Sequence, residues 1–178
     1  MNKVQRIKQE LAYKGHIVDV YDDYLILPNG ENVIYDLVKF KGGAAVLAID
    51  EEGKVILVKQ YRNSLDRDVL ELPSGCYDFP GEDGEVCARR EFAEETGCIA
   101  GKMEFLVEIV SAIGAGNEKT KIYFTKDYVL GQQKLDPNEF VEIIKMDINE
   151  IVDMIFDGKL IDAKTIAGIM AYKVKFNV

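Results

Sequence analysis

The stretch Arg90-Glu91-Phe92-Ala93-Glu94-Glu95-Thr96-Gly97 places three carboxylates within five residues and ends on a glycine. On a helix, side chains four residues apart share a face and those three apart nearly do. Glu91 and Glu95 then project in the same direction, with Glu94 beside them. Clustered carboxylates repel one another unless a cation lies among them, and Mg²⁺ prefers oxygen ligands. The stretch therefore predicts a divalent-cation site on one face of a helix.

The helix itself is predicted over residues 85–96. Gly97 is well placed to end it, because glycine adopts the left-handed conformation that closes many helices. At about 100° per residue, the three glutamates fall within an arc of roughly 100°. We expect the opposite side of the helix to be apolar and to pack on a sheet. That predicted apolar side consists of Val86, Ala88, Phe92 and Ala93.

The loop before the helix extends the pattern back to Gly75, with Glu82 between them. The whole resembles the Nudix box of the Nudix hydrolases, which reads Gly, five residues, Glu, seven residues, then Arg-Glu-apolar-x-Glu-Glu-x-Gly-apolar. Six residues rather than five separate Gly75 from Glu82, and we place the extra residue in the loop, where insertions are tolerated. The alternative is an ordinary solvated helix with an Arg90–Glu94 ion pair, which leaves the matching loop unexplained.

Further segments, in their order along the chain, resemble the ADP-ribose pyrophosphatase branch of this family. Where that branch carries a Ser-Pro-Gly segment after the box, this chain has Ile113 in place of the proline. Proline fixes φ, so we expect the loop that helps to choose the sugar to differ. The resemblance thus defines the reaction type more firmly than the substrate. The matching segments are Leu27-Pro28-Asn29-Gly30, Val58-Lys59-Gln60-Tyr61-Arg62, Glu71-Leu72-Pro73-Ser74-Gly75 and Asp162-Ala163-Lys164-Thr165-Ile166-Ala167-Gly168.

The resemblance implies an enzyme in which water cleaves the diphosphate of ADP-ribose, giving AMP and ribose 5-phosphate. It implies Mg²⁺ as cofactor, with Mn²⁺ as the alternative, since a bound cation withdraws charge from phosphorus and lowers the pKa of bound water. Glu91 and Glu95 are then the principal metal ligands, with Glu94 close by and the main-chain carbonyl of Ser74 completing a site. Arg90 is implied to orient the glutamates through ion pairs.

By the same resemblance, the general base is a glutamate on a late loop, here the segment before a predicted strand at 140–146. Glu139 is the first candidate and Glu142 the second, although both also fit an interpretation as solvent-facing charges. The lone His16, placed in a predicted strand, is expected to be structural, because no Ser, Cys or metal-ligand partner is near it in sequence.

Three further residues are candidates for binding the substrate. Arg62 is a candidate phosphate clamp, because its planar fork suits phosphate oxygens; the alternative is a surface cation. For Glu71 two interpretations stay open, contact with the substrate or capping of a turn. Glu118 occupies the place where the family often carries an acidic residue near the terminal ribose.

Other functions remain as alternatives. The first is the same chemistry on another nucleoside diphosphate sugar, such as GDP-mannose. The second is a Nudix-fold module that senses such a metabolite without cleaving it, and the third is a purely structural interaction domain. The complete set of Glu91, Glu94 and Glu95 argues against the sensor, and a purely structural domain predicts that Glu94→Gln and Glu95→Gln change nothing measurable.

The order of elements predicts an α+β protein rather than a regular βαβ series. The resemblance makes this the Nudix fold, a mixed central sheet sandwiched between helices, preceded by an antiparallel sheet. We divide the chain into an N-terminal β-sheet region, 1–41, and a Nudix hydrolase domain, 42–178. In the ADP-ribose branch two subunits exchange the N-terminal sheet, which implies a homodimer. Strands are expected at 16–20, 24–27, 32–38, 44–49, 55–58, 103–110, 121–125 and 140–146, and helices at 85–96, 148–156 and 163–173.

Composition limits the partners and the compartment. The 178 residues carry a formal net charge of -9, which disfavours nucleic acid or an anionic membrane surface as partner. Three cysteines, none in a C-x-x-C pair, suggest neither a disulfide framework nor a zinc site and fit a reducing cytoplasm. Neither a signal peptide nor an apolar run long enough to span a bilayer is expected.

Overall fold

The computed structural model describes residues 3–178 and divides into two compact units. The first unit comprises the chain up to Gly42 together with Val110–Lys119, and the second comprises Gly43–Ile109 with Thr120–Val178. No helix in this described part of the chain is long and apolar enough to cross a membrane.

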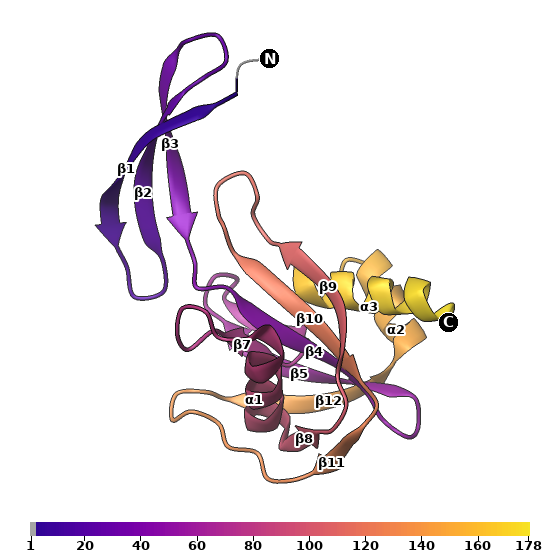
Figure 1. Cartoon of the computed structure of the whole chain (residues 1–178). Coiled ribbons are helices and arrows are strands. Elements are labelled where there is room, and N and C mark those ends of the chain that lie inside the picture. The colour runs from indigo at the N-terminus through magenta and orange to yellow at the C-terminus, as the bar shows by residue number, and fades with distance from the viewer. Residues whose placement is uncertain (1–2) are drawn as a thin grey trace. The chain divides into compact units, whose positions relative to one another are not determined.

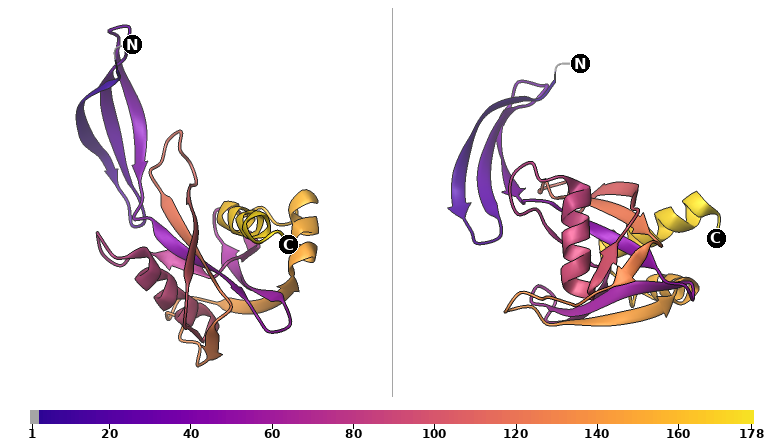
Figure 2. Two further views of the ribbon diagram at one scale, coloured as in Figure 1. Left: turned by 45° about the vertical axis from the view of Figure 1, so that its right-hand side comes forward. Right: turned by 60° about the horizontal axis from the view of Figure 1, so that its bottom comes forward.

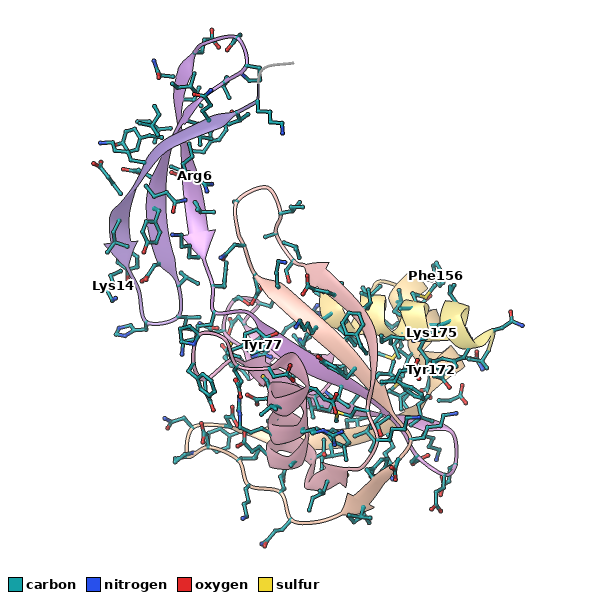
Figure 3. The ribbon with its side chains drawn as sticks, viewed as in Figure 1. Arg6, Lys14, Tyr77, Phe156, Tyr172 and Lys175 are labelled. Carbon is teal, nitrogen blue, oxygen red and sulfur yellow. The ribbon has the colours of Figure 1, made fainter. Side chains whose placement is uncertain are left out.

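The first unit is built on a three-stranded antiparallel sheet in the order β1-β2-β3 (Figure 1). Arg6, on β1, donates through Nε and Nη2 to the two carboxylate oxygens of Asp23 on β2, at 2.7 and 2.8 Å, and Asp23 is only 5% exposed. Arg6 is labelled on its strand in Figure 3. The predicted N-terminal antiparallel sheet is therefore confirmed. Its strands are β1 (Gln5–Lys14), β2 (Asp19–Ile26) and β3 (Asn32–Lys39).

Details of this sheet differ from the sequence prediction. β2 runs without a break through Asp22 and Asp23, where two strands were expected, because Arg6 neutralises the buried Asp23 within the sheet. His16 lies in the bend between β1 and β2, where Gly15 N–H donates to Val18 O at 2.9 Å, and not in a strand. β1 was not predicted, because its two register shifts break the alternation that marks a strand.

The segment Val110–Lys119 joins this first unit through β3. Val38 N–H donates to Ala115 O at 2.8 Å, and Asn117 N–H donates back to Val38 O at 3.2 Å. Ile113, which stands where the ADP-ribose branch has proline, is 86% exposed at the tip of this segment. The loop that carries the sequence departure is thus held at its base and open at its tip.

The second unit contains a mixed sheet with the main strand order β12-β5-β4-β10-β9. β4 lies in the middle and is buried along its whole length, as the continuous apolar run predicts. β10 runs parallel to β4, and the other pairings of β4 and β5 are antiparallel. The strands of this sheet are β4 (Gly43–Ile49), β5 (Lys54–Arg62), β6 (Arg67–Glu71), β7 (Ser74–Cys76), β9 (Glu104–Val110), β10 (Lys119–Thr125) and β12 (Val141–Asp147). β8 (Cys98–Ala100) and β11 (Tyr128–Leu130) form a separate antiparallel pair.

Helices cover both faces of this sheet (Figure 2). α1 (Gly84–Thr96) packs its Phe92 with Val46 and Ile56 in one cluster. α2 (Ile148–Phe156) and α3 (Ala163–Phe176) pack on the other face, in the cluster that contains Leu47. Alternate residues of β4 therefore pack into two hydrophobic cores, one on each face of the sheet. The predicted sandwich of a mixed sheet between helices is confirmed.

The α1 helix agrees with its predicted range, but its buried side is different. The Asp83 side chain caps its first turn, and Gly97 ends it with φ 71°. Val86, predicted to be buried, is 56% exposed, because the buried side of the helix runs through Cys87, Ala88 and Phe92 instead. Glu95, predicted on the polar side, is only 3% exposed. One carboxylate of the acidic stretch is therefore inside the protein.

Candidate active site

Two carboxylates of α1 lie against the main chain of β7. Ser74 N–H donates to Glu95 Oε2 at 2.7 Å, and Gln60 Nε2, on β5, lies 3.4 Å from Glu95 Oε1. The Glu91 carboxylate fills the space that a side chain at Gly75 would need, since a Cβ there would be 2.1 Å from Glu91 Cδ. The glycine that opens the box is thus required for the carboxylate to approach β7.

Arg90 ties the loop before the helix to these carboxylates. Its Nη1 donates to Glu91 Oε1 at 2.6 Å and to Glu94 Oε2 at 3.3 Å. Its Nη2 donates to the Cys76 carbonyl at 3.0 Å and reaches Glu82 Oε2 at 3.5 Å. Because one guanidinium joins β7, the loop and the helix, Arg90 fixes how Glu91 and Glu94 are presented.

The extra residue of the loop is accommodated in a turn. Glu82 N–H donates to Phe79 O at 3.2 Å, and Gly81 within that turn has φ 89° with open space around it. Glu82 also accepts from Asp78 N–H at 2.8 Å, so the first glutamate of the box closes the loop. The additional residue therefore leaves the helix and its carboxylates in register.

Burial makes the carboxylates expensive to ionise without a cation. Burial is the largest influence on Glu95 and, with the charges of Glu91 and Glu139, raises its pKa to about 8 despite the bond from Ser74 N–H. Burial likewise raises the pKa of Glu91, although Arg90 opposes the shift. A positive charge placed between Glu91 and Glu95 would lower the pKa of both carboxyl groups.

The donor set fits a hard divalent cation. Arg90 bonds the carboxylates of Glu91 and Glu94, and Ser74 N–H bonds that of Glu95, so the second half of α1 offers three carboxylates beside the β7 main chain. Oxygen is the ligand that Mg²⁺ prefers. Within residues 3–178, no group of three or more His, Cys, Asp or Glu side chains is already gathered as a metal ion requires. Here Arg90 and Ser74 N–H hold the carboxylates instead.

A second charged cluster lies where β6 meets the start of α3. Arg62 donates through Nε and Nη2 to the two oxygens of Glu71, at 2.5 and 2.7 Å, and Lys164 Nζ also bonds Glu71. The Glu71 side chain is 3% exposed and that of Lys164 is 14% exposed. Asp162, which caps α3, pairs with Lys164 at 3.1 Å. The cluster orients Arg62 by burying its counter-ion.

The contacts of Glu71 with Arg62 and Lys164 bear on its two proposed roles, contact with the substrate and capping of a turn. Burial alone would raise the pKa of Glu71, but the hydrogen bond from Arg62 and the charge of Lys164 lower it, so the carboxylate stays ionised. In the described part of the chain its oxygens bond two cations and no turn N–H. Its side chain therefore orients Arg62.

Sequence reasoning did not single out Lys164, Gln60 or the closing role of Glu82. The signal for Lys164 was its position two residues after the Asp162 helix cap, in a segment that already matched the ADP-ribose branch. A second signal was Glu71, because a carboxylate inside a protein requires compensating charge.

Glu139 and Glu142, the two candidates for the general base, lie in different places. On β12, Val141 pairs with Gln60, whose side chain reaches Glu95. The next residue, Glu142, pairs with Lys59 and lies 3.7 Å from its Nζ, so it points to the opposite face of the sheet.

Glu139 lies on the loop before β12. Its charge contributes to the raised pKa of Glu91 and Glu95, after the larger effect of burial, so it is within electrostatic reach of both. Glu118 belongs to the first unit, where it is half-buried. An open cavity of about 440 Å³ is lined by Gln60, Glu139 and Glu142 but by none of the α1 side chains Arg90, Glu91, Glu94 and Glu95, so it is not the diphosphate site by itself.

A family model described as the NUDIX domain matches residues 39–168. The chain belongs to the Nudix family. ADP-ribose pyrophosphatase of Bacillus subtilis (strain 168) is 33% identical over 95% of this chain and 92% of its own length. Methanol dehydrogenase activator of Bacillus methanolicus is 33% identical over 92% of this chain and 89% of its own length. GDP-mannose pyrophosphatase of Yersinia enterocolitica is 30% identical over 92% of each.

A crystal structure of an ADP compounds hydrolase superposes on this Nudix chain with a TM-score of 0.86. It covers 99% of this chain and 96% of that one at 20% identity, a likeness that shows the fold alone. The predicted Nudix fold is thus confirmed, as are the predicted family and its resemblance to ADP-ribose pyrophosphatases.

The Lys164→Met variant tests the second cluster. We expect the free energy of unfolding near pH 7 to fall by about 3 kcal/mol, as when one partner of a buried ion pair is removed. Because the folded pKa of Glu71 is lowered, its stabilisation is present above the unfolded pKa and is lost as the pH falls through the folded pKa. The gap between variant and wild type should therefore shrink as the pH falls below the unfolded value of 4.5, measured by urea unfolding.

Lys159→Met is the matched control, since Lys159 pairs with Asp157 on the surface. We expect its free energy of unfolding to stay close to that of the wild type, because exposed ion pairs contribute little to stability. Equal effects of the two substitutions would contradict a buried role for Lys164.

Proposed function

We propose that this Nudix protein is a Mg²⁺-dependent hydrolase that cleaves the diphosphate of ADP-ribose by water attack, giving AMP and ribose 5-phosphate. The observation that carries the proposal is the pair of Glu91 and Glu95, buried against the Ser74–Gly75 main chain, whose charge calls for a divalent cation. The Bacillus subtilis relative supports ADP-ribose as the substrate. Mn²⁺ is the alternative cation.

In this proposal Glu91, Glu95 and the carbonyl of Ser74 hold the cation, with Glu94 completing the set. When bound, the cation supplies charge withdrawal from phosphorus and a more acidic water. Arg90 keeps Glu91 and Glu94 at the end of β7 by donating to both. Removing the charge of either glutamate would leave Arg90 without one of its acceptors and the site without a ligand.

Arg62 binds a phosphate oxygen of the substrate. Glu71 occupies its Nε and Nη2, while no acceptor for Nη1 is found among the described residues. A guanidinium held on one edge and free on the other is pre-oriented for an anion, and it loses little conformational freedom on binding.

Glu139 accepts the proton of the attacking water. It is exposed on the loop before β12, and its charge acts on Glu91 and Glu95. Glu142, the second candidate, points to the other face of the sheet beside Lys59. Glu118 is kept as a proposed contact for the terminal ribose, on the family resemblance alone.

Two other functions are distinguished by turnover. GDP-mannose is the rival substrate, and the Yersinia relative is named for that activity. A sensor that binds without cleaving is the rival from another class. Incubation with Mg²⁺ and each nucleotide sugar separates them, since only hydrolysis releases AMP or GMP, and binding without release would favour the sensor.

Charge removal at the carboxylates tests the catalytic proposal. We expect Glu94→Gln and Glu95→Gln to lower kcat on ADP-ribose by at least about 100-fold with the fold retained, because each removes a ligand charge. Glu85→Gln is the matched control on the same helix, where Glu85 pairs with Arg89. Wild-type activity in the two site variants, measured as AMP release, would sink the metal assignment.

We also propose a cytoplasmic homodimer. The three cysteines are free thiols, which supports a reducing compartment. The first unit is a three-stranded sheet with several exposed apolar side chains, and such a sheet needs a covered face to be stable. These side chains include Ile7, Leu11, Tyr13, Ile34 and Tyr35.

Light scattering at micromolar concentration tests the assembly. We expect about twice the chain mass of 20.0 kDa. A monomer under these conditions would contradict the dimer without affecting the proposed chemistry.

A further inference from the structure

The loop between β11 and β12 fastens its first half onto the C-terminal end of α1. Gly131 N–H donates to the Gly97 carbonyl at 2.7 Å, and Lys134 N–H donates to the Glu94 carbonyl at 3.0 Å. Between them, Gln133 Nε2 donates to the Glu95 carbonyl at 2.7 Å. We call these three hydrogen bonds the loop anchor.

The anchor supplies partners that the helix lacks. The last carbonyls of an α-helix have no intrahelical donors, and a buried carbonyl without a partner is destabilising. The last turn of α1 contains no basic residue that could serve instead. The loop therefore caps the helix at the carbonyls of Glu94 and Glu95, two of the residues proposed to bind the cation.

Two glycines allow the loop to come this close. A Cβ at Gly97 would lie 2.7 Å from the Gln133 nitrogen, and a Cβ at Gly131 would lie 2.8 Å from the Gly97 carbonyl oxygen. Contacts this short do not occur for real side chains, so any larger residue would push the loop away. The box glycine thus ends the helix and also makes room for the anchor.

The second half of the loop carries Glu139. After Lys134 the chain makes a turn in which Glu139 N–H donates to Asp136 O at 2.9 Å, and it enters β12 at Val141. The segment between the anchor and β12 is short, so the position of the anchor limits where the Glu139 carboxylate can reach.

We infer that Gln133 is a positioning residue for catalysis, which sets the reach of Glu139 by bonding the main chain of Glu95. This inference rests on the proposed function of Glu139 as general base. Gln133 makes the side-chain bond of the anchor, whereas the other two bonds come from the backbone. Replacing its side chain therefore loosens the loop while leaving the helix cap in part.

Kinetics of Gln133→Leu test the inference. We expect kcat on ADP-ribose to fall at least about tenfold, because misplacing a catalytic group by about 1 Å costs up to about 100-fold, while KM changes less than about twofold. Gln132→Leu is the matched control, since no side-chain hydrogen bond of Gln132 is found among the described residues. The same loss in both variants, or none in Gln133→Leu, would overturn the inference.

A double variant separates positioning from a general structural effect. In a Glu139→Gln background the base is already lost, so adding Gln133→Leu should lower kcat by less than about twofold. A further tenfold loss would show that Gln133 acts through the metal helix or the fold, and would overturn its assignment to Glu139.

Hydrogen exchange keeps the test independent of turnover. We expect the amide protons of residues 134–136, 138 and 139 to exchange about tenfold faster in Gln133→Leu and at the wild-type rate in Gln132→Leu. If the wild type does not hydrolyse ADP-ribose, the proposed function fails while exchange still decides the anchor. Unchanged exchange in Gln133→Leu would overturn the anchor whatever the activity.

Discussion

The contact between the Glu95 carboxylate and the Ser74 main chain is the constraint on which the rest of the second unit depends. To make it, α1 must lie on β7 closely enough that only glycine fits at position 75. The same close packing buries Glu95 and raises its pKa to about 8, so a cation beside Glu95 would stabilise its ionised form. The stability of the metal-free protein and its affinity for a cation thus both depend on the packing of α1 on β7.

The two charged clusters of the second unit have separate roles. At α1, carboxylates outnumber their one guanidinium, Arg90, and the excess negative charge calls for a cation. At the start of α3, Arg62 and Lys164 share Glu71, so the cluster offers a guanidinium edge to an anion. A diphosphate bridging a metal ion and Arg62 would satisfy both. The chemistry would then reside in α1, while the contacts that choose the substrate would lie elsewhere.

Spacing alone predicted the helix, its glycine end and the three glutamates, because a four-residue period needs no tertiary information. The central buried strand followed in the same way from its continuous apolar run. What the sequence could not provide were effects of distant contacts. Asp23 continues a strand because Arg6 neutralises it, Val86 is exposed because α1 turns Cys87 and Glu95 inward instead, and Lys164 acts through a residue 93 positions away. Each depends on a partner that periodicity does not reveal.

The central claim is that the buried carboxylates of α1 require a divalent cation, and thermal unfolding without substrate tests it most directly. Because the folded pKa of Glu95 is raised from 4.5 to about 8, the metal-free protein should lose stability as the pH rises through this interval. Mg²⁺ binds only the folded site, so it should raise the unfolding temperature of the wild type at about pH 8 and barely affect Glu95→Gln. An equal shift in both proteins, or none in the wild type, would contradict the account.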